Sequence, residues 1–354
     1  MDRFRHIHFA VNPDWETTGP ARSLSIAPIT SQLATYVSYA DVVFRQETVQ
    51  RLDPGRYWVP SSPSGPTMGN SLEIIERAPE ALHDVHGPWD YQGLTEQYTL
   101  YNRTTSLLHS EFGSEGMANR RTLDDLAPSE AQAPVSLDNP LYSHLASWWV
   151  RRDTWDRMFG PLTKVDELIR ATQFTQAEGL RYAIEANRRR KWRNSGSLPW
   201  QFNEPYPNPA CTSAVDFYAR PKPAYYTIAR AYAPVTVTAA YPRLAREGGT
   251  AFEAEAWANV SGPEDIAAHL QARLVGLSGT VYGEVTSTHT LAGDRATRLA
   301  ALTSWTVPVD EHGFFLDLTL AMRRPFLGIR GVNGFVGATR ALAAATGRPR
   351  LAFG

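Results

Sequence analysis

The hydrophobic pattern of this sequence changes its period near Pro234, and this change limits the possible fold more than any other feature. Before Pro234, short apolar or aromatic runs alternate with longer segments of helical period. After it, apolar and polar residues alternate one by one between turn signals, as in residues 252–260. Alternating strands and helices predict a parallel sheet or barrel. Strictly alternating strands predict an antiparallel β-sandwich.

Four short buried strands are predicted before Pro234, and each ends in polar or aromatic residues followed by a loop. A (β/α) barrel builds its active site from the loops at the carboxyl ends of its strands. A full barrel has eight strands, so four strands predict the second half of one. The strands are predicted at 57–62, 82–86, 106–111 and 197–202. Helices are predicted at 33–52, 72–77, 96–102, 142–159, 162–192 and 221–232.

The fold class predicted from these patterns is α/β followed by all-β, with four consecutive segments. Residues 1–34 lack periodicity and form an irregular start. Residues 35–233 form the carboxyl-terminal half of a (β/α)8 barrel. Residues 234–322 form an immunoglobulin-like β-sandwich. The Arg-, Gly- and Ala-rich residues 323–354 are expected to be poorly ordered.

A glutamate ends the predicted strand at 106–111, in the segment HSEFG. A carboxylate at that position faces a site on one side and the core on the other, and its burial is costly unless the charge is paired or used. Glycosidases use two carboxyl groups, a nucleophile and a proton donor. Glu111 therefore becomes the candidate nucleophile, and the alternative is a glutamate that forms a salt bridge at a strand end.

The other strand ends carry residues suited to binding a sugar. If the four strands are parallel, their ends meet on one face of the sheet. Tryptophan rings stack on sugar rings, while His, Asn and Glu bond hydroxyls. The alternatives are core packing for the tryptophans and a structural hydrogen bond for the histidine. The candidate substrate-binding residues are Trp58, His86, Trp89, Trp200, Asn203 and Glu204.

Net charge and aromatic content bear on the partners of the chain. The net charge of −1 gives no overall attraction to nucleic acid or to a membrane. The 10 Trp and 15 Tyr, concentrated in loops rich in polar residues, suit sugar binding, and the alternative is that they fill the core. No signal peptide is evident at the start, which favours the cytoplasm. His83, His86 and His109 lack the spacing of a zinc site, so we expect no metal and no cofactor.

The ordered set of segments resembles glycoside hydrolase family two, which includes β-galactosidases, β-mannosidases and β-glucuronidases. The β-mannosidase-like members are the most similar. No single segment is decisive, but their order and spacing over about 45–233 are specific. The segments that carry the resemblance are LDPGRYW at 52–58, SSP at 61–63, DVHGPW at 84–89, SEFG at 110–113, WQFNEPYP at 200–207, AVDF at 214–217 and PKPAYY at 221–226.

The resemblance implies a retaining exo-β-glycosidase acting on terminal β-linked sugars, such as a β-mannoside or β-galactoside, with Glu111 as nucleophile. The family's acid/base glutamate ends an Asn-Glu pair before the LDPG segment, and no such pair precedes residue 60. Glu16 is the nearest substitute, and Glu47 fits a surface charge on a helix. Asn203-Glu204 follows the last strand and is expected to contact substrate.

The sequence leaves two other interpretations open. Domains that normally precede the barrel in this family are not found, so the chain is expected to be a truncated or frame-disrupted product. Such a chain would have lost any signal peptide, and its oligomeric state is not readable. It could then be a carbohydrate-binding remnant without hydrolysis. It could also be an unstable fragment, because half a barrel exposes open sheet edges.

Overall fold

The computed structural model describes residues 51, 54–55, 61–136, 138–143, 151–311, 313–322 and, for the backbone, 335–344. Two compact units are present, Met1–Ser61 and Ser62–Gly354, and the description below concerns the second unit. The predictions for Glu16, Glu47 and Trp58, for the helix at 33–52 and for most of the strand at 57–62 lie outside the described residues.

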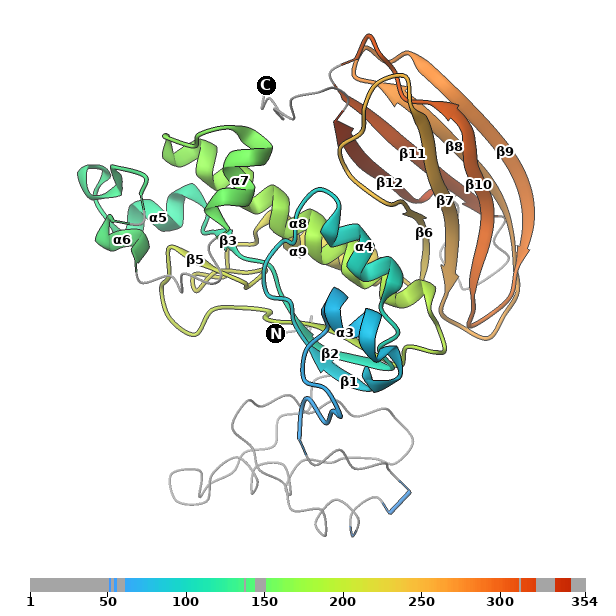
Figure 1. Ribbon diagram of the computed structural model, residues 1–354, viewed down its shortest axis with the longest axis horizontal. Coiled ribbons are helices and arrows are strands. Elements are labelled where there is room, and N and C mark those ends of the chain that lie inside the picture. Colours follow the sequence, from blue (N-terminus) through green and yellow to red (C-terminus); the bar gives the residue numbers. More distant parts are fainter. Residues whose placement is uncertain are drawn as a thin grey trace, which may run out of the picture. The chain divides into compact units, whose positions relative to one another are not determined.

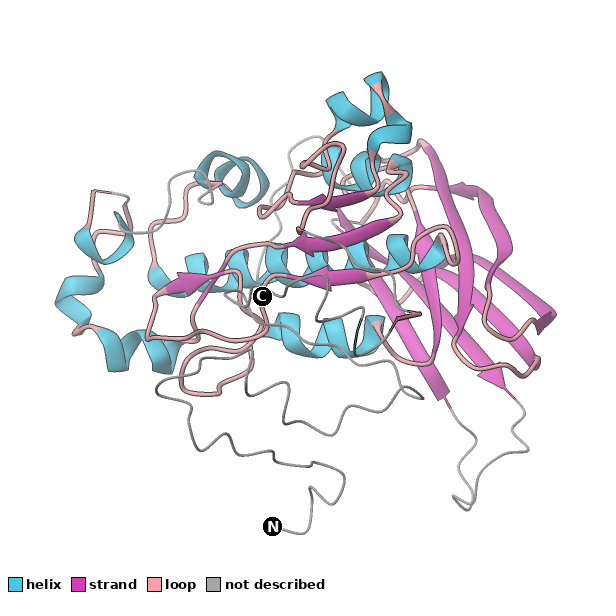
Figure 2. Cartoon of the chain, turned by 90° about the horizontal axis from the view of Figure 1, so that it is seen from below, coloured by secondary structure: helices cyan, strands magenta, loops and turns pink. Residues whose placement is uncertain are grey.

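A small parallel sheet is formed by three of the four predicted barrel strands, those predicted at 82–86, 106–111 and 197–202. Its strand order is β1-β2-β4, and both pairs are parallel. Figure 2 shows these short strands beside the long helix of the unit. Val85 and Phe112 are fully buried, which is why such short runs form strands. In the described residues the sheet is open and closes no barrel. Its strands are β1 (Asp84–His86), β2 (Leu108–Phe112) and β4 (Ser197–Pro199).

Helices cover this sheet, and the longest of them is buried along most of its length. This helix, α8, contacts α4, α9, β3, β4 and β7. Because neighbouring elements surround it, both its apolar and its polar side chains are buried. Asp166 and Glu167 in its first turn, and Arg188 and Arg189 in its last, complement the helix dipole. The helices are α3 (Leu72–Arg77), α4 (Glu96–Arg103), α5 (Arg120–Leu126), α6 (Pro140–Ser143), α7 (Arg152–Phe159), α8 (Val165–Arg189) and α9 (Pro223–Ala231), with 3-10 helices η2 (Pro79–Ala81) and η3 (Ser129–Gln132).

Two antiparallel sheets follow α9 (Figure 1). One has the order β10-β7-β6 and the other β12-β11-β8-β9. In β8, Ala268, Leu270, Ala272 and Leu274 are buried and alternate with more exposed residues, as the period of two predicts. The strands are β6 (Val235–Ala240), β7 (Ala251–Val260), β8 (Ile266–Gly276), β9 (Val281–Leu291), β10 (Ala296–Thr306), β11 (Gly313–Met322) and β12 (Phe335–Ala344). A separate pair, β3 (Gly116–Met117) and β5 (Ala210–Cys211), lies in the first part of the chain.

The structure differs from the predicted elements in several places. Helix α5 and the strand pair β3-β5 lie where no element was predicted, and the strand predicted at 197–202 ends at Pro199. The helix predicted at 142–159 is present as α6 and α7, and residues 144–150 between them are outside the described part. Strands β9 and β10 were not foreseen, because polar residues such as Thr286, Thr288 and Thr290 replace the apolar half of the pattern in β9. Residues 335–344, within the segment expected to be poorly ordered, pair with β11 as strand β12.

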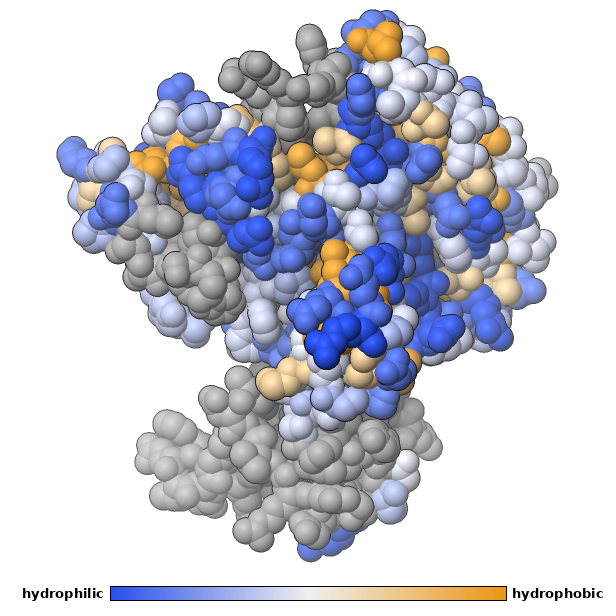
Figure 3. Space-filling view, viewed as in Figure 1, coloured by the Kyte–Doolittle hydropathy of each residue, from blue (hydrophilic) through white to orange (hydrophobic). Residues whose placement is uncertain are grey.

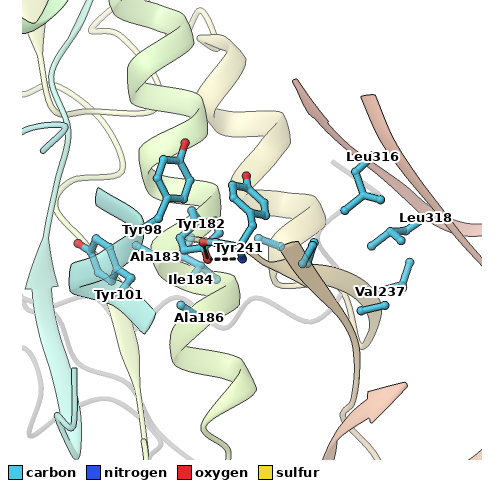
Figure 4. Packing of buried hydrophobic residues seen from close by; sticks show 14 of the residues in the cluster. Tyr98, Tyr101, Tyr182, Ala183, Ile184, Ala186, Val237, Tyr241, Leu316 and Leu318 are labelled. Carbon is cyan, nitrogen blue, oxygen red and sulfur yellow. Dashed lines mark hydrogen bonds between the residues drawn. The ribbon is translucent and has the colours of Figure 1, made fainter. Parts of the chain in front are cut away.

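One continuous apolar cluster joins the helices to the two antiparallel sheets. Figure 4 shows Tyr98 of α4, Tyr182 of α8 and Tyr241 after β6 close together, with Leu316 and Leu318 of β11 on the sheet side. The Tyr182 ring centroid lies 4.6 Å from that of Tyr98 and 4.9 Å from that of Tyr241. The sheets and helices therefore share a core and belong to one compact unit.

The outer surface of this unit is mixed in character. On the face in Figure 3, hydrophilic residues cover much of the described part, and apolar residues form smaller patches among them. None of the helices in the described residues combines the length and the apolar content needed to cross a bilayer.

Candidate active site

The Glu111 side chain lies near the carboxyl end of β2 and is 22% exposed, so it faces an open site and not the packed core. The indole N–H of Trp89 donates a hydrogen bond to its Oε1 over 2.7 Å. Nδ1 of His86 lies 3.8 Å from its Oε2. The parallel pairing of β1 with β2 sets this arrangement, because His86 is opposite Glu111 in the register. The structure therefore brings together three of the predicted site residues.

Trp89 and His86 also contact each other. Their rings meet edge to face, with centroids 6.4 Å apart and an interplanar angle of 88°. A carboxylate that accepts one hydrogen bond and stays partly open to solvent is held in one orientation and can still attack a ligand. Among the described residues no Lys or Arg pairs with this carboxylate, and its one close ionisable neighbour is His86 at 3.8 Å, so the geometry leaves room for a ligand beside Glu111.

Three polar residues that the sequence analysis did not single out support this group. Ser62 Oγ lies 2.9 Å from Nε2 of His86 and donates to Ser110 Oγ over 3.0 Å. Ser110 in turn donates to the Asp84 carboxylate. Asp84 and Ser110 belong to neighbouring parallel strands. Ser62, Asp84 and Ser110 all lie in segments that carry the family resemblance, and this was the signal that could have found them.

Trp200 follows β4 and is half-buried beside the strand that carries Glu111. Its backbone N–H donates to the carbonyl of Phe112 over 2.6 Å. Asn203 is exposed, and its backbone forms an isolated bridge with Val215. Trp200 therefore lies at the end of β4, the strand that pairs directly with β2, which carries Glu111.

Glu204 lies in a different environment from the one predicted. The residue is 2% exposed, and its Oε1 lies 3.3 Å from Nζ of Lys222 and accepts a 2.5 Å hydrogen bond from Ser213. Lys222 also donates to the carbonyls of Gly116 and Cys211. With its carboxylate enclosed in this way, Glu204 joins three segments of the chain and does not face substrate. The sequence could not show this, because nothing local marks Lys222 as buried.

Glu115 is a second buried glutamate and follows Glu111 by four positions in the sequence. It is 3% exposed, and among the described residues neither carboxyl oxygen has a hydrogen-bond partner. Burial raises its pKa to about 8, partly offset by Lys222 and reinforced by Asp90. A carboxyl group without donors is more stable in the protonated form.

This raised pKa predicts a dependence of stability on pH. The unfolded chain ionises Glu115 near 4.5, whereas the folded chain keeps it protonated up to about pH 8. The folded state thus binds more protons between these values, so its stability contribution is complete below pH 4.5 and is lost as pH rises toward 8. For Glu115→Gln we expect this loss, on the order of 1 kcal/mol per pH unit, to disappear. Urea unfolding of both proteins from pH 5 to pH 8 measures the free energy of unfolding as a function of pH. If this free energy falls equally with pH in both proteins, the raised pKa of Glu115 is wrong.

Gly113 lets the end of β2 approach the chain after β4. A Cβ built on it would lie 2.7 Å from the carbonyl oxygen of Trp200 and 3.2 Å from a methyl group of Thr212. The first contact is with backbone, so it cannot be relieved by a side-chain rotation. We expect Gly113→Ala to lower the free energy of unfolding by about 1–3 kcal/mol. Thermal unfolding tests this, with Gly69→Ala as a reference, since a Cβ there meets only a methyl group of Ile74 at 3.8 Å, an ordinary van der Waals contact.

The three histidines weighed for zinc occupy different environments. His83 is exposed, and His86 is held by Ser62. His109 is fully buried, contacts the carbonyl of Gly87 through Nε2 at 2.8 Å, and has its pKa lowered to about 3 by burial. Within the described ranges, no three His, Cys, Asp or Glu side chains come close enough together to hold a metal ion.

Comparison with known sequences finds β-mannosidases. The chain is 28% identical over 204 residues to Beta-mannosidase B of Aspergillus fumigatus, covering 54% of this chain and 22% of that protein. Over 202 residues it is 28% identical to Beta-mannosidase B of Aspergillus niger, covering 53% and 22%. The chain thus spans about a fifth of the length of these relatives. No family model matches the sequence.

Comparison with solved structures finds the same fold. A β-D-mannosidase from Dictyoglomus thermophilum superposes with a TM-score of 0.64 at 21% identity, over 84% of this chain and 34% of that one. An exo-chitosanase from Amycolatopsis orientalis gives a TM-score of 0.55 at 14% identity, over 73% and 30%. The resemblance to β-mannosidase-like glycoside hydrolases of family two is therefore confirmed for part of the chain.

Proposed function

We propose that this β-mannosidase-like chain carries the nucleophile half of the active site of a retaining exo-β-glycosidase, with Glu111 as the nucleophile. The observation that carries the proposal is the partly exposed Glu111 carboxylate, which accepts the hydrogen bond of Trp89. The similarity to β-mannosidases supports glycoside hydrolysis, and the names of these relatives point to a terminal β-mannoside as substrate.

The proposed reaction has two displacements. Glu111 attacks the anomeric carbon and forms an ester to the sugar, while the glycosidic oxygen leaves with a proton from a carboxylic acid. Water then attacks the same carbon, passes a proton to that second carboxylate and releases Glu111. Trp89 holds Oε1 of Glu111 through its indole N–H, which leaves Oε2 on the His86 side to form the bond. Developing positive charge on the sugar is stabilised by the Glu111 carboxylate.

The sugar-binding roles of the neighbouring residues belong to the same proposal. Trp89 and Trp200 present aromatic surface near the carboxyl ends of β1 and β4, and His86 and Asn203 present polar groups for hydroxyls. Trp58 is included from the family resemblance alone. Glu204 is left out, because its carboxylate is enclosed with Lys222.

The finer architecture is also a proposal. We assign residues 62–233 to the later strands and helices of a (β/α)8 barrel, supported by the parallel order β1-β2-β4 and by the fold shared with the bacterial β-mannosidase. Residues 234–322, together with strand β12 (Phe335–Ala344), then form the immunoglobulin-like sandwich that follows the barrel, with its two sheets sharing one core.

Covalent trapping tests the nucleophile directly. The full chain is incubated with 2,4-dinitrophenyl 2-deoxy-2-fluoro-β-mannoside, whose leaving group needs little protonation and whose fluorine slows hydrolysis of the ester. We expect the mass to rise by one fluorosugar, located on Glu111 after digestion. The matched β-galactoside reports on sugar preference. Label on another residue would overturn the assignment, and saturable mannoside binding without label would indicate a binding remnant.

A further inference from the structure

A chain of hydrogen bonds leads from a buried carboxylate to the ring of His86. Asp84 is 4% exposed and lies on β1, two residues before His86. Its Oδ2 accepts the backbone N–H of Ser64 over 2.9 Å, and its Oδ1 accepts the hydroxyl of Ser110. Ser110 accepts from Ser62 over 3.0 Å, and Ser62 lies 2.9 Å from Nε2 of His86. Four side chains thus form one connected path.

The carboxylate end gives this path a direction. An ionised carboxylate can only accept hydrogen bonds, and each serine hydroxyl has one hydrogen to donate. Ser110 uses its hydrogen on Asp84, so it must accept from Ser62. Ser62 uses its hydrogen on Ser110, so it must accept from His86. When the His86 ring carries a single hydrogen, this path places that hydrogen on Nε2.

The other ring nitrogen then faces Glu111 without a hydrogen. Nδ1 lies 3.8 Å from Oε2 of Glu111, which is too long for a hydrogen bond. The lone pair of Nδ1 repels the Glu111 carboxylate slightly. The same lone pair can accept a hydrogen bond from a ligand hydroxyl group placed next to Glu111. A sugar bound for attack by Glu111 presents hydroxyls close to its anomeric carbon, so Nδ1 is placed to accept one of their hydrogens.

We propose that Asp84 is a positioning residue which, through Ser110 and Ser62, keeps the hydrogen of His86 on Nε2 and so makes Nδ1 an acceptor for a sugar hydroxyl next to Glu111. The inference rests on the proposed function for the identity of the ligand. The direction of the hydrogen-bond path rests on the structure alone, so the two can fail separately.

Asp84→Asn reverses the path with almost no change of shape. The amide oxygen of asparagine can keep the Ser64 N–H, which turns its NH₂ group toward Ser110. Ser110 must then donate to Ser62, and Ser62 must donate to Nε2 of His86. The ring hydrogen moves to Nδ1, where it points at the Glu111 carboxylate and no longer leaves an acceptor for the sugar.

Nitrogen NMR of protein labelled with ¹⁵N-histidine measures the tautomer without any need for turnover. We expect His86 to carry its hydrogen on Nε2 in the parent chain and on Nδ1 in Asp84→Asn. His109 is an internal control: the carbonyl of Gly87 requires the hydrogen on its Nε2, and Asn187 donates to its Nδ1 over 3.2 Å. Its signals should keep the Nε2–H pattern in both proteins, and His86→Gln assigns the His86 signals.

Two further variants keep the test informative if Asp84→Asn unfolds. Ser62 is exposed, so Ser62→Ala should fold, and it removes the acceptor of the Nε2 hydrogen. Ser110→Ala disconnects Asp84 while leaving Ser62 in place. We expect a mixture of His86 tautomers in both. An Nδ1 hydrogen on His86 in the parent chain, or an unchanged tautomer in every variant, would overturn the proposal.

Kinetics then connect the tautomer to the sugar. With an activated aryl β-mannoside, Asp84→Asn should lose about 10- to 100-fold in kcat/KM. The loss should shrink for the deoxy substrate that lacks the hydroxyl contacted by Nδ1, whereas a merely structural defect would lower all substrates alike. If the tautomer reverses but no protein turns over the glycoside, the proposed function fails and the positioning role of Asp84 stands.

Discussion

Glu111→Gln is expected to abolish hydrolysis of an activated aryl β-mannoside, with a loss of at least about 10³-fold in kcat/KM. The amide has the shape of the carboxylate, and its oxygen can still accept the hydrogen bond of Trp89. It lacks the negative charge that forms the bond to the anomeric carbon and stabilises positive charge on the sugar. The fold should therefore persist while the chemistry stops.

Initial rates on 2,4-dinitrophenyl β-mannoside measure this loss, and circular dichroism shows that the variant is folded. Glu284→Gln provides the matched control, since it removes an exposed carboxylate on β9, far along the chain from the site. Glu111→Ala with added azide is a second check, because a small anion can occupy the space of the missing carboxylate and restore release of the phenol. A Glu111→Gln protein that keeps a tenth of the parent rate would rule out the nucleophile assignment.

Arg181→Met is expected to destabilise the folded chain by about 3–5 kcal/mol, because it leaves two buried carboxylates without their cation. Arg181 lies on α8 and forms ion pairs with Glu178 over 2.7 Å and with Glu185 over 2.6 Å. It also donates to the hydroxyl of Tyr241 over 2.8 Å, and Tyr98 donates to Glu178 over 3.0 Å. This cluster stands between the helices and the antiparallel sheets.

The direction of the pKa shifts shows how closely these charges depend on each other. Burial lowers the pKa of Arg181, but the charges of Glu178, Glu185 and Tyr241 and the hydrogen bond to Glu178 together outweigh burial, so that the net shift is upward. Burial raises the pKa of Glu185, and Arg181 opposes this shift. Burial, followed by the charge of Glu178, raises the pKa of Tyr98. Figure 4 shows Tyr98, Tyr182 and Tyr241 lying next to one another at α8, and all three are buried.

Urea unfolding at pH 7 measures the effect of Arg181→Met. The triple change Arg181→Met, Glu178→Gln and Glu185→Gln should recover much of the loss, since it removes all three of the paired charges. Arg77→Met is the surface control, because its ion pair with Glu73 is exposed and should contribute less than about 0.5 kcal/mol. An Arg181→Met protein as stable as the parent would show that the cluster is hydrated in solution.

Local sequence patterns were enough to locate most of the elements that position the site. Short apolar runs that end in turn residues lie at or before His86, Glu111 and Trp200. The first two runs form strands that contain His86 and Glu111, and the third forms the strand β4, which ends directly before Trp200. Period-two alternation likewise located β6, β7, β8 and β11. These patterns work because a residue's exposure in a strand depends on its near neighbours.

The sequence by itself located the carboxyl ends of β1, β2 and β4 to within three residues, and it therefore placed Glu111 at the open end of the sheet. Only the tertiary structure decided what each charge contacts. It enclosed Glu204 with Lys222, left Glu115 without a partner, and connected Asp84 to His86 through serines on other segments. Those contacts join residues far apart in the chain, and the free energy of a charge depends on the partners and the water that folding leaves around it.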